Sequence, residues 1–178
     1  MVQGGQEVPH CSICGLVLDD DEAPSETGTP GRAALAYVLI AEDSPLICNA
    51  VADMLESQHI AMEVGRAANG VEFVSQATAR FRQQGKLSLA ILDVEMPIMN
   101  GVQAARSLRD LERQLHVPRK TPVLFFTSRK IDERFKQILQ QLQPSSFVNK
   151  GTSTDPEHLA QRVRKVLSVL LPGKVPAA

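Results

Sequence analysis

Short apolar runs alternate along this chain with longer segments in which apolar residues recur every three or four positions. Continuous apolar runs of this length are typical of strands covered on both faces of a sheet, whereas the three-to-four spacing is typical of amphipathic helices. The sequence predicts strands at 36–41, 60–67, 87–92, 122–126 and 146–149, the second of them with the weakest pattern. It predicts helices within 44–55, 69–85, 100–117, 131–143 and 155–170.

Each predicted helix follows a strand, which gives five strand–helix units in about 140 residues. Right-handed crossovers between parallel strands then favour an α/β fold, a doubly wound three-layer sandwich. Ser44 and Pro45 are typical of a helix N-cap followed by a first-turn proline. The apolar faces are expected to include Leu46, Ile47, Ala50, Val51, Met54 and Leu55 in the first helix and Val71, Val74, Ala77 and Phe81 in the second.

The first 31 residues differ in composition from the rest of the chain. They contain a Cys-x-x-Cys pair, an acidic run and a segment rich in Pro, Gly, Ser and Thr, which is typical of a flexible extension. We therefore expect an extension at 1–31, a folded domain at 32–172 and a frayed tail at 173–178.

Charge and hydropathy narrow the class of protein. The 178 residues carry a net charge of -1, which gives no indication of direct nucleic-acid binding. No apolar stretch reaches the roughly 18 residues needed to cross a bilayer, and the N-terminus does not resemble a secretory signal. With three cysteines, an odd number, the chain is expected to be cytoplasmic rather than membrane-bound or secreted.

Polar residues whose side chains can bind metal or take part in catalysis follow four of the predicted strands. Glu42 and Asp43 come after the first strand, Asp93 after the third, Thr127 after the fourth and Lys150 shortly after the fifth. Because the carboxyl ends of parallel strands share one edge of the sheet, these side chains are expected to meet. Taken singly, each has an ordinary explanation as a cap, a loop residue or a surface lysine, so the joint placement carries the argument.

Such a cluster favours metal-dependent phosphoryl chemistry. Carboxylates kept together need a cation to offset their repulsion, and all-oxygen ligands suit Mg²⁺ or Mn²⁺. Asp93 can attack phosphorus to form an acyl phosphate, while Lys150 and the Thr127 hydroxyl can contact phosphoryl oxygens. The sequence therefore predicts a metal-dependent phosphoacceptor site centred on Asp93.

The segments AEDSP, LDVEMPIMNG, FFTS and FVNK, in this order, resemble the motifs of response-regulator receiver domains of two-component signalling. The resemblance covers residues 36–171 and implies a flavodoxin-like fold with strand order 2-1-3-4-5. It implies that Asp93 is phosphorylated, that Asp43 is the main acidic metal ligand and that Glu42 assists through water. Glu95 would offer its backbone carbonyl to the metal.

The same resemblance implies a two-state switch with protein partners. Thr127 and Lys150 would be the switch hydroxyl and the phosphate-pairing lysine, and Phe147 the aromatic switch residue, although Phe147 is also consistent with an ordinary core phenylalanine. A histidine kinase or phosphotransfer protein would donate the phosphoryl group. The face formed by the fourth helix, fifth strand and fifth helix would contact a downstream protein, and a homodimer is possible.

Three positions beside the site depart from the family or add to it. Gly151 replaces the proline that usually follows the site lysine, which puts in doubt the cis peptide bond normally found there. Glu95 and Arg129 lie two places after Asp93 and Thr127, and we expect their side chains to overhang the site and shield the acyl phosphate from water.

The N-terminal His10, Cys11 and Cys14 resemble one half of a zinc ribbon. A structural zinc site needs four ligands, and only three are present, so a second chain or a partner would have to complete it. An unstructured tail and a redox-active pair are the alternatives. Cys48 lies on the first predicted helix, and its side chain is expected to be semi-buried and to have a packing role.

Three functions compete for this sequence. The first is the phosphorylation-dependent switch, which is not an enzyme beyond its own phosphorylation and dephosphorylation. The second is a receiver fold that acts as a constitutive interaction module. The third is an aspartyl-phosphate phosphohydrolase of the haloacid dehalogenase type, which fits less well because Glu95 stands where that family has a second Asp.

Overall fold

The computed structural model describes residues 35–128, 131–150 and 156–171. In chain order, the strands are β1 (Val38–Ala41), β2 (Val64–Ala67), β3 (Leu89–Asp93), β4 (Val123–Thr127) and β5 (Ser145–Asn149). The helices are α1 (Pro45–Ser57), α2 (Gly70–Arg82), α3 (Gly101–Gln114), α4 (Glu133–Gln141) and α5 (Pro156–Leu170). The predicted alternation of strand and helix is therefore confirmed, with boundaries shifted by a few residues.

All paired strands of the sheet are parallel and follow the order β2-β1-β3-β4-β5. This order confirms the predicted flavodoxin-like fold. The register pairs Ala41 with Leu92, Asp93 with Phe126 and Thr127 with Asn149, so the carboxyl ends of β1, β3, β4 and β5 lie along one edge. The edge carries the candidate site.

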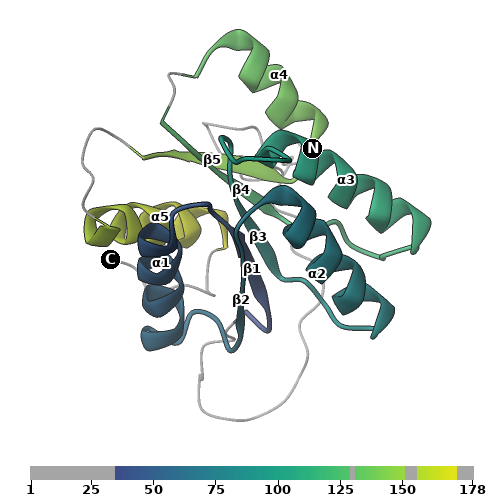
Figure 1. The fold of residues 1–178 in the computed structure, drawn as a ribbon, viewed down its shortest axis with the longest axis horizontal. Helices are drawn as coiled ribbons and strands as arrows, with labels where there is room; N and C mark the ends of the chain where they lie inside the picture. The colour runs from purple at the N-terminus through teal and green to yellow at the C-terminus, as the bar shows by residue number, and fades with distance from the viewer. Residues whose placement is uncertain (1–34, 129–130, 151–155, 172–178) are drawn as a thin grey trace, which may run out of the picture.

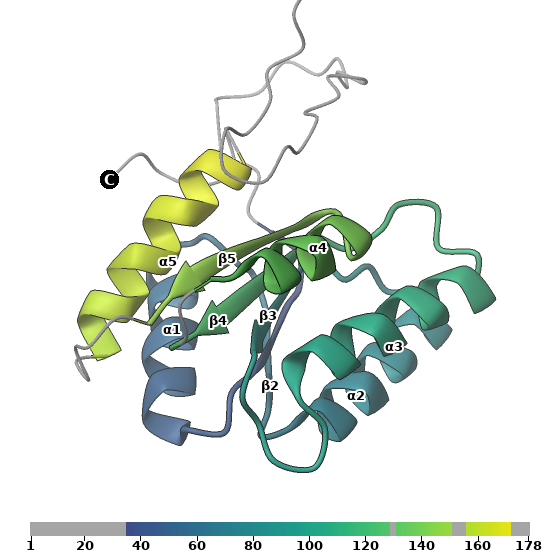
Figure 2. The same ribbon diagram turned by 90° about the horizontal axis from the view of Figure 1, so that it is seen from above.

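Helices cover both faces of the sheet. Figures 1 and 2 show α1 and α5 on one face, with α2 and α3 on the other. Alternate strand residues supply the two cores, as the period of two in a strand requires. Ile40, Ile91 and Phe126 pack with α1 and α5, whereas Leu92 and Phe125 pack on the opposite face with α2, α3 and α4.

Local sequence signals determine where three helices begin. The Asn100 side chain accepts a hydrogen bond from the Gln103 backbone N–H, and the Gln103 side chain accepts one from the Asn100 N–H, which forms a capping box at the start of α3. Asn69 caps α2 in a similar way through two backbone N–H groups. Ser44 occupies the predicted N-cap position of α1, but its side chain makes no capping hydrogen bond, and Pro45 at the first turn begins the helix instead.

The predicted apolar faces of α1 and α2 were partly wrong. Leu46 is 66% exposed and Val71 is 47% exposed, although both were expected to face the core. At about 100° per residue, Leu46 lies on the side of α1 opposite the fully buried Leu55, and Val71 lies about 200° around α2 from Phe73. The buried stripe of α2 is therefore centred on Phe73 and Ala77.

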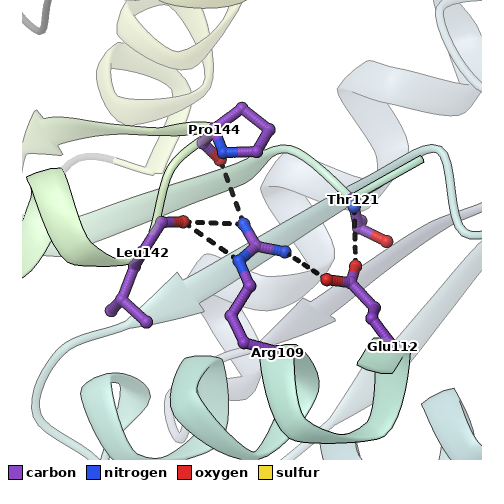
Figure 3. A network of polar contacts seen from close by, with 5 residues as sticks. All are labelled: Arg109, Glu112, Thr121, Leu142 and Pro144. Carbon is purple, nitrogen blue, oxygen red and sulfur yellow. Dashed lines mark hydrogen bonds and ion pairs between the residues drawn. The ribbon is translucent and has the colours of Figure 1, made fainter. Parts of the chain in front are cut away.

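A buried polar network, which the sequence analysis did not anticipate, ties α3 to the segment before β5 (Figure 3). The Arg109 guanidinium donates hydrogen bonds to the backbone carbonyls of Leu142 and Pro144 and pairs with Glu112 at 2.8 Å. Glu112 also accepts a hydrogen bond from the Thr121 N–H at 2.6 Å, just before β4. The pair thus satisfies backbone groups of two connections on this side of the sheet.

None of the helices in the described ranges is long and apolar enough to span a membrane.

Candidate functional site

The polar residues predicted to meet do lie at one edge of the sheet. Asp93 is the last residue of β3 and Thr127 the last residue of β4, while Glu42 directly follows β1 and Lys150 directly follows β5. Since β1, β4 and β5 lie beside or close to β3 in the sheet, residues more than 100 positions apart in sequence become neighbours.

Three carboxylates form the centre of the site. One oxygen each from Glu42, Asp43 and Asp93 lies within 4.8 Å of the other two. Glu42 and Asp93 are buried, with exposed fractions of 3% and 4%, whereas Asp43 is exposed at the rim. Two carboxylates about 5 Å apart repel by roughly 3 kcal/mol at an effective dielectric of 20, so this arrangement needs positive charge.

Lys150 supplies part of that charge. Its Nζ lies 2.9 Å from Asp93 Oδ2 and 2.9 Å from Glu42 Oε2, and it donates a hydrogen bond to Glu42 Oε1 at 3.2 Å. The lysine side chain is only 14% exposed, so water screens these contacts weakly. The Lys150 backbone N–H also donates to the Thr127 carbonyl at 2.7 Å, which fixes the start of the loop that carries the ammonium.

Burial shifts the protonation of both buried acids. Burial and the nearby charge of Asp93 raise the pKa of Glu42 to about 7, although Lys150 opposes the shift. Burial also raises the pKa of Asp93, again against the opposing effect of Lys150. For Lys150, burial favours the neutral form, but Glu42 and Asp93 outweigh it and raise the pKa of the ammonium. The site therefore holds more negative charge than one lysine neutralises.

Backbone groups orient the two buried carboxylates. The Glu95 N–H donates to Asp93 Oδ1 at 3.2 Å, and the Ser44 N–H donates to Glu42 Oε1 at 3.3 Å. Gly101, the first residue of α3, packs directly on β3, because a Cβ there would lie 2.1 Å from the Asp93 carbonyl oxygen. The sequence predicts a helix within 100–117 but gives no indication of this close approach.

The residues present fit a hard divalent cation. Glu42 Oε2 is buried and accepts no hydrogen bond within the described residues, although it forms an ion pair with Lys150. A carboxylate oxygen has a second lone pair besides the one that faces Lys150, so this buried oxygen beside two other carboxylates is suited to bind a metal. A donor set made only of oxygen suits Mg²⁺ or Mn²⁺.

Two further predicted residues lie on the strands next to this cluster. Thr127 is buried, with an exposed fraction of 2%, at the end of the strand adjacent to β3. Phe147 on β5 pairs in register with Phe125 and is half-buried against the core on the α2–α3 face. Phe147 thus packs against this core and remains partly exposed.

Several sequence predictions fall outside the described residues. They concern the shielding role of Arg129, the effect of Gly151 after the site lysine, and the zinc-ligand candidates His10, Cys11 and Cys14. Within the described residues, Cys48 is a free thiol that is 5% exposed, which matches the expectation of a packing role.

Comparison with protein families matches residues 38–164 to the response regulator receiver domain. Among curated proteins, a protein-glutamate methylesterase/protein-glutamine glutaminase from Clostridium acetobutylicum is 29% identical over 91 residues. The match covers 51% of this chain and 23% of that protein, so the similarity spans about a quarter of the relative's length.

Solved structures show the same fold. The signal receiver domain of NarL from Mycobacterium tuberculosis aligns with a TM-score of 0.58 at 26% identity, covering 79% of this chain and 99% of that domain. The receiver domain of the histidine kinase CKI1 from Arabidopsis thaliana, in complex with Mg²⁺ and BeF3⁻, aligns with a TM-score of 0.58 at 21% identity. That alignment covers 75% of this chain and 90% of that domain.

Proposed function

Because the chain belongs to the response regulator receiver domain family, we propose that it is a phosphorylation-dependent signalling switch with Asp93 as its phosphoacceptor. The observation that carries the proposal is the complete charge arrangement at one sheet edge. Three carboxylate oxygens lie within 4.8 Å of one another, and the Lys150 ammonium lies 2.9 Å from Asp93. A receiver fold kept only as a binding scaffold has no need of these mutually repelling groups.

In the proposed reaction, an Asp93 carboxylate oxygen attacks the phosphorus of a phosphohistidine. The new oxygen–phosphorus bond forms as the phosphorus–nitrogen bond breaks, and the histidine of the donor leaves with the bonding electrons and takes up a proton. The Glu95 N–H orients Asp93, and Lys150 is placed to pair with an oxygen of the transferred group. The donor would be a sensor histidine kinase or a phosphotransfer protein.

Glu42, Asp43 and Asp93 would hold Mg²⁺ or Mn²⁺ beside the phosphoacceptor, and the Glu95 carbonyl is a further candidate ligand. When bound, the cation supplies positive charge that favours the approach of an anionic phosphoryl group to an anionic carboxylate. Because Asp43 is exposed at the rim, solvent and a donor protein would reach the cluster from this side.

Output would come from the side of the sheet that carries β4 and β5. The buried Thr127 lies one strand from Asp93, and its hydroxyl is the candidate that moves toward the phosphoryl group. Phe147, half-buried on the neighbouring strand, would follow that movement. The change would alter the face formed by α4, β5 and α5, which would contact a downstream protein or a second copy of the chain.

The direct test is incubation of the purified chain with acetyl phosphate and Mg²⁺, followed by intact mass measurement. We expect the mass increase of one phosphoryl group, which is lost when Mg²⁺ is chelated beforehand. Asp93→Asn should abolish the increase, whereas Asp110→Asn, an exposed carboxylate on α3, should leave it intact. An unmodified wild-type chain would favour the constitutive interaction module instead.

A further inference from the structure

A pocket lies at the opposite edge of the sheet from Asp93. It has a volume of about 660 Å³ and is bounded by the residues that precede β1, β3 and β4 and by the residues after α2 and α3. Its apolar lining includes Phe81, Leu87, Leu115, Val117, Pro122 and Leu171. We call it the basal pocket.

Cations surround this apolar lining. Lys86, Arg119 and Lys120 line the basal pocket and are exposed, and none of them forms an ion pair within the described residues. The lining contains no acidic residue. A pocket with an apolar floor and three uncompensated cations suits a ligand that is apolar and acidic at once.

The chain itself carries a segment with this composition next to the pocket. Residues 1–34 contain six acidic side chains and one basic side chain, and they join the described structure at Leu35, which lines the basal pocket. Within them, Leu16-Val17-Leu18 is followed directly by Asp19-Asp20-Asp21-Glu22. The C-terminal residues 172–178 also start beside the pocket, at Leu171, but their one charged side chain is Lys174, which the pocket cations would repel.

We propose that residues 16–22 of this chain bind in its own basal pocket. The three apolar residues occupy the floor, and the four acidic residues pair with Lys86, Arg119 and Lys120. Twelve residues separate Glu22 from Leu35, and a chain of that length spans about 20 Å on average, so the segment can reach the pocket without strain. Attachment also gives the segment an effective concentration on the order of millimolar at the pocket, which allows a weak contact to persist.

Hydrogen–deuterium exchange of the full chain, followed by mass spectrometry of peptides, tests the proposal. We expect amides of residues 16–22 to exchange about tenfold more slowly than those of residues 23–31, and the difference to shrink at high salt. The double variant Lys86→Glu/Lys120→Glu should remove this protection. The matched control, Arg106→Glu/Arg134→Glu, reverses two exposed charges on α3 and α4 and should leave it unchanged.

Exchanging the charges of the segment and the pocket distinguishes loss of ion pairing from general damage to the fold. Adding Asp19→Lys/Asp21→Lys to the Lys86→Glu/Lys120→Glu variant should restore protection of residues 16–22. Equal exchange in segments 16–22 and 23–31 of the wild type would overturn the proposal, as would protection that survives pocket reversal. Protection that grows with protein concentration would assign the pocket to a second copy and also overturn it. Because Asp93 is not involved, these outcomes are independent of phosphorylation.

Discussion

At the scale of single residues, the site is a balance between buried negative charge and one ammonium. Glu42 and Asp93 share Lys150, which lies 2.9 Å from a carboxylate oxygen of each. Burial, followed by the negative charge of Asp93, raises the pKa of Glu42 to about 7 despite the opposing effect of Lys150. The protein thus builds a site that is short of positive charge until a cation binds.

Metal affinity should therefore depend on pH. Below pH 7 the folded protein keeps a proton on Glu42, and a divalent cation must displace it, so affinity rises as pH rises through the pKa. We expect the Kd for Mg²⁺ to fall by up to about tenfold between pH 6 and pH 8, measured by calorimetry. Glu42→Gln should bind more weakly and lose this dependence; an unchanged pH profile in that variant would assign the proton to another group.

The close approach at Gly101 should make the site sensitive to a single methyl group. Gly101→Ala would place a Cβ 2.1 Å from the Asp93 carbonyl oxygen, so either β3 or the start of α3 must move. We expect a loss of about 1–3 kcal/mol in the free energy of unfolding and slower phosphorylation by acetyl phosphate. Denaturant titration measures the first effect, and Arg106→Ala, exposed on the same helix, should cause neither.

At the scale of elements, both ends of α3 contact the strands or the segments that lead into them. Its start rests on Asp93 through Gly101, and its C-terminal half carries the Arg109–Glu112 pair that binds backbone groups before β4 and β5. Both side chains are nearly fully buried, with exposed fractions of 9% and 3%. Removing one partner would leave the other charge buried without compensation.

Arg109→Met should accordingly lower the free energy of unfolding by about 3 kcal/mol, because Glu112 and two backbone carbonyls lose their partner. The matched control is Arg113→Met on the same helix, which removes an exposed pair with Asp110 and should cost less than about 1 kcal/mol. Chemical denaturation of both variants checks the difference. Equal losses would show that the buried network contributes no more than a surface pair.

At the scale of the whole molecule, the helices are not anchored equally in the two cores. Among the described residues, α1 has five buried residues and α3 has six, whereas α4 has Leu139 alone. Apart from Leu139, α4 contacts the core through half-buried residues such as Phe135, whose ring packs edge-on against Phe125. Of α1, α3 and α4, the helix that can shift at least cost is therefore α4.

Phosphorylation should change α4 more than α1. In hydrogen exchange of the full chain, we expect α4 amides to exchange faster than those of α1, and acetyl phosphate with Mg²⁺ to alter the rate in α4 by several-fold. Asp93→Asn under the same conditions is the control and should show no change. A response confined to α1 and α2 would contradict output through the face formed by α4, β5 and α5.

Much of this architecture follows from linear sequence. The unbroken apolar runs and the helical spacing between them predicted five strand–helix units, and polar residues after four strands predicted the members of the site. These features could be read locally because hydrophobic periodicity and helix capping depend on near neighbours, as Asn100 and Gln103 show. The order of the strands came from a resemblance to a family rather than from periodicity.

The tertiary structure decided what depends on packing between distant segments. The orientation of α1 and α2 left Leu46 and Val71 exposed, because helical spacing alone does not say which of two apolar stripes meets the sheet. Three features of the structure depend on contacts that the sequence does not indicate. They are the Arg109–Glu112 network, the contact of Gly101 with Asp93, and the raised pKa of Glu42. Their energies arise from burial and geometry, which exist only once the sheet has assembled.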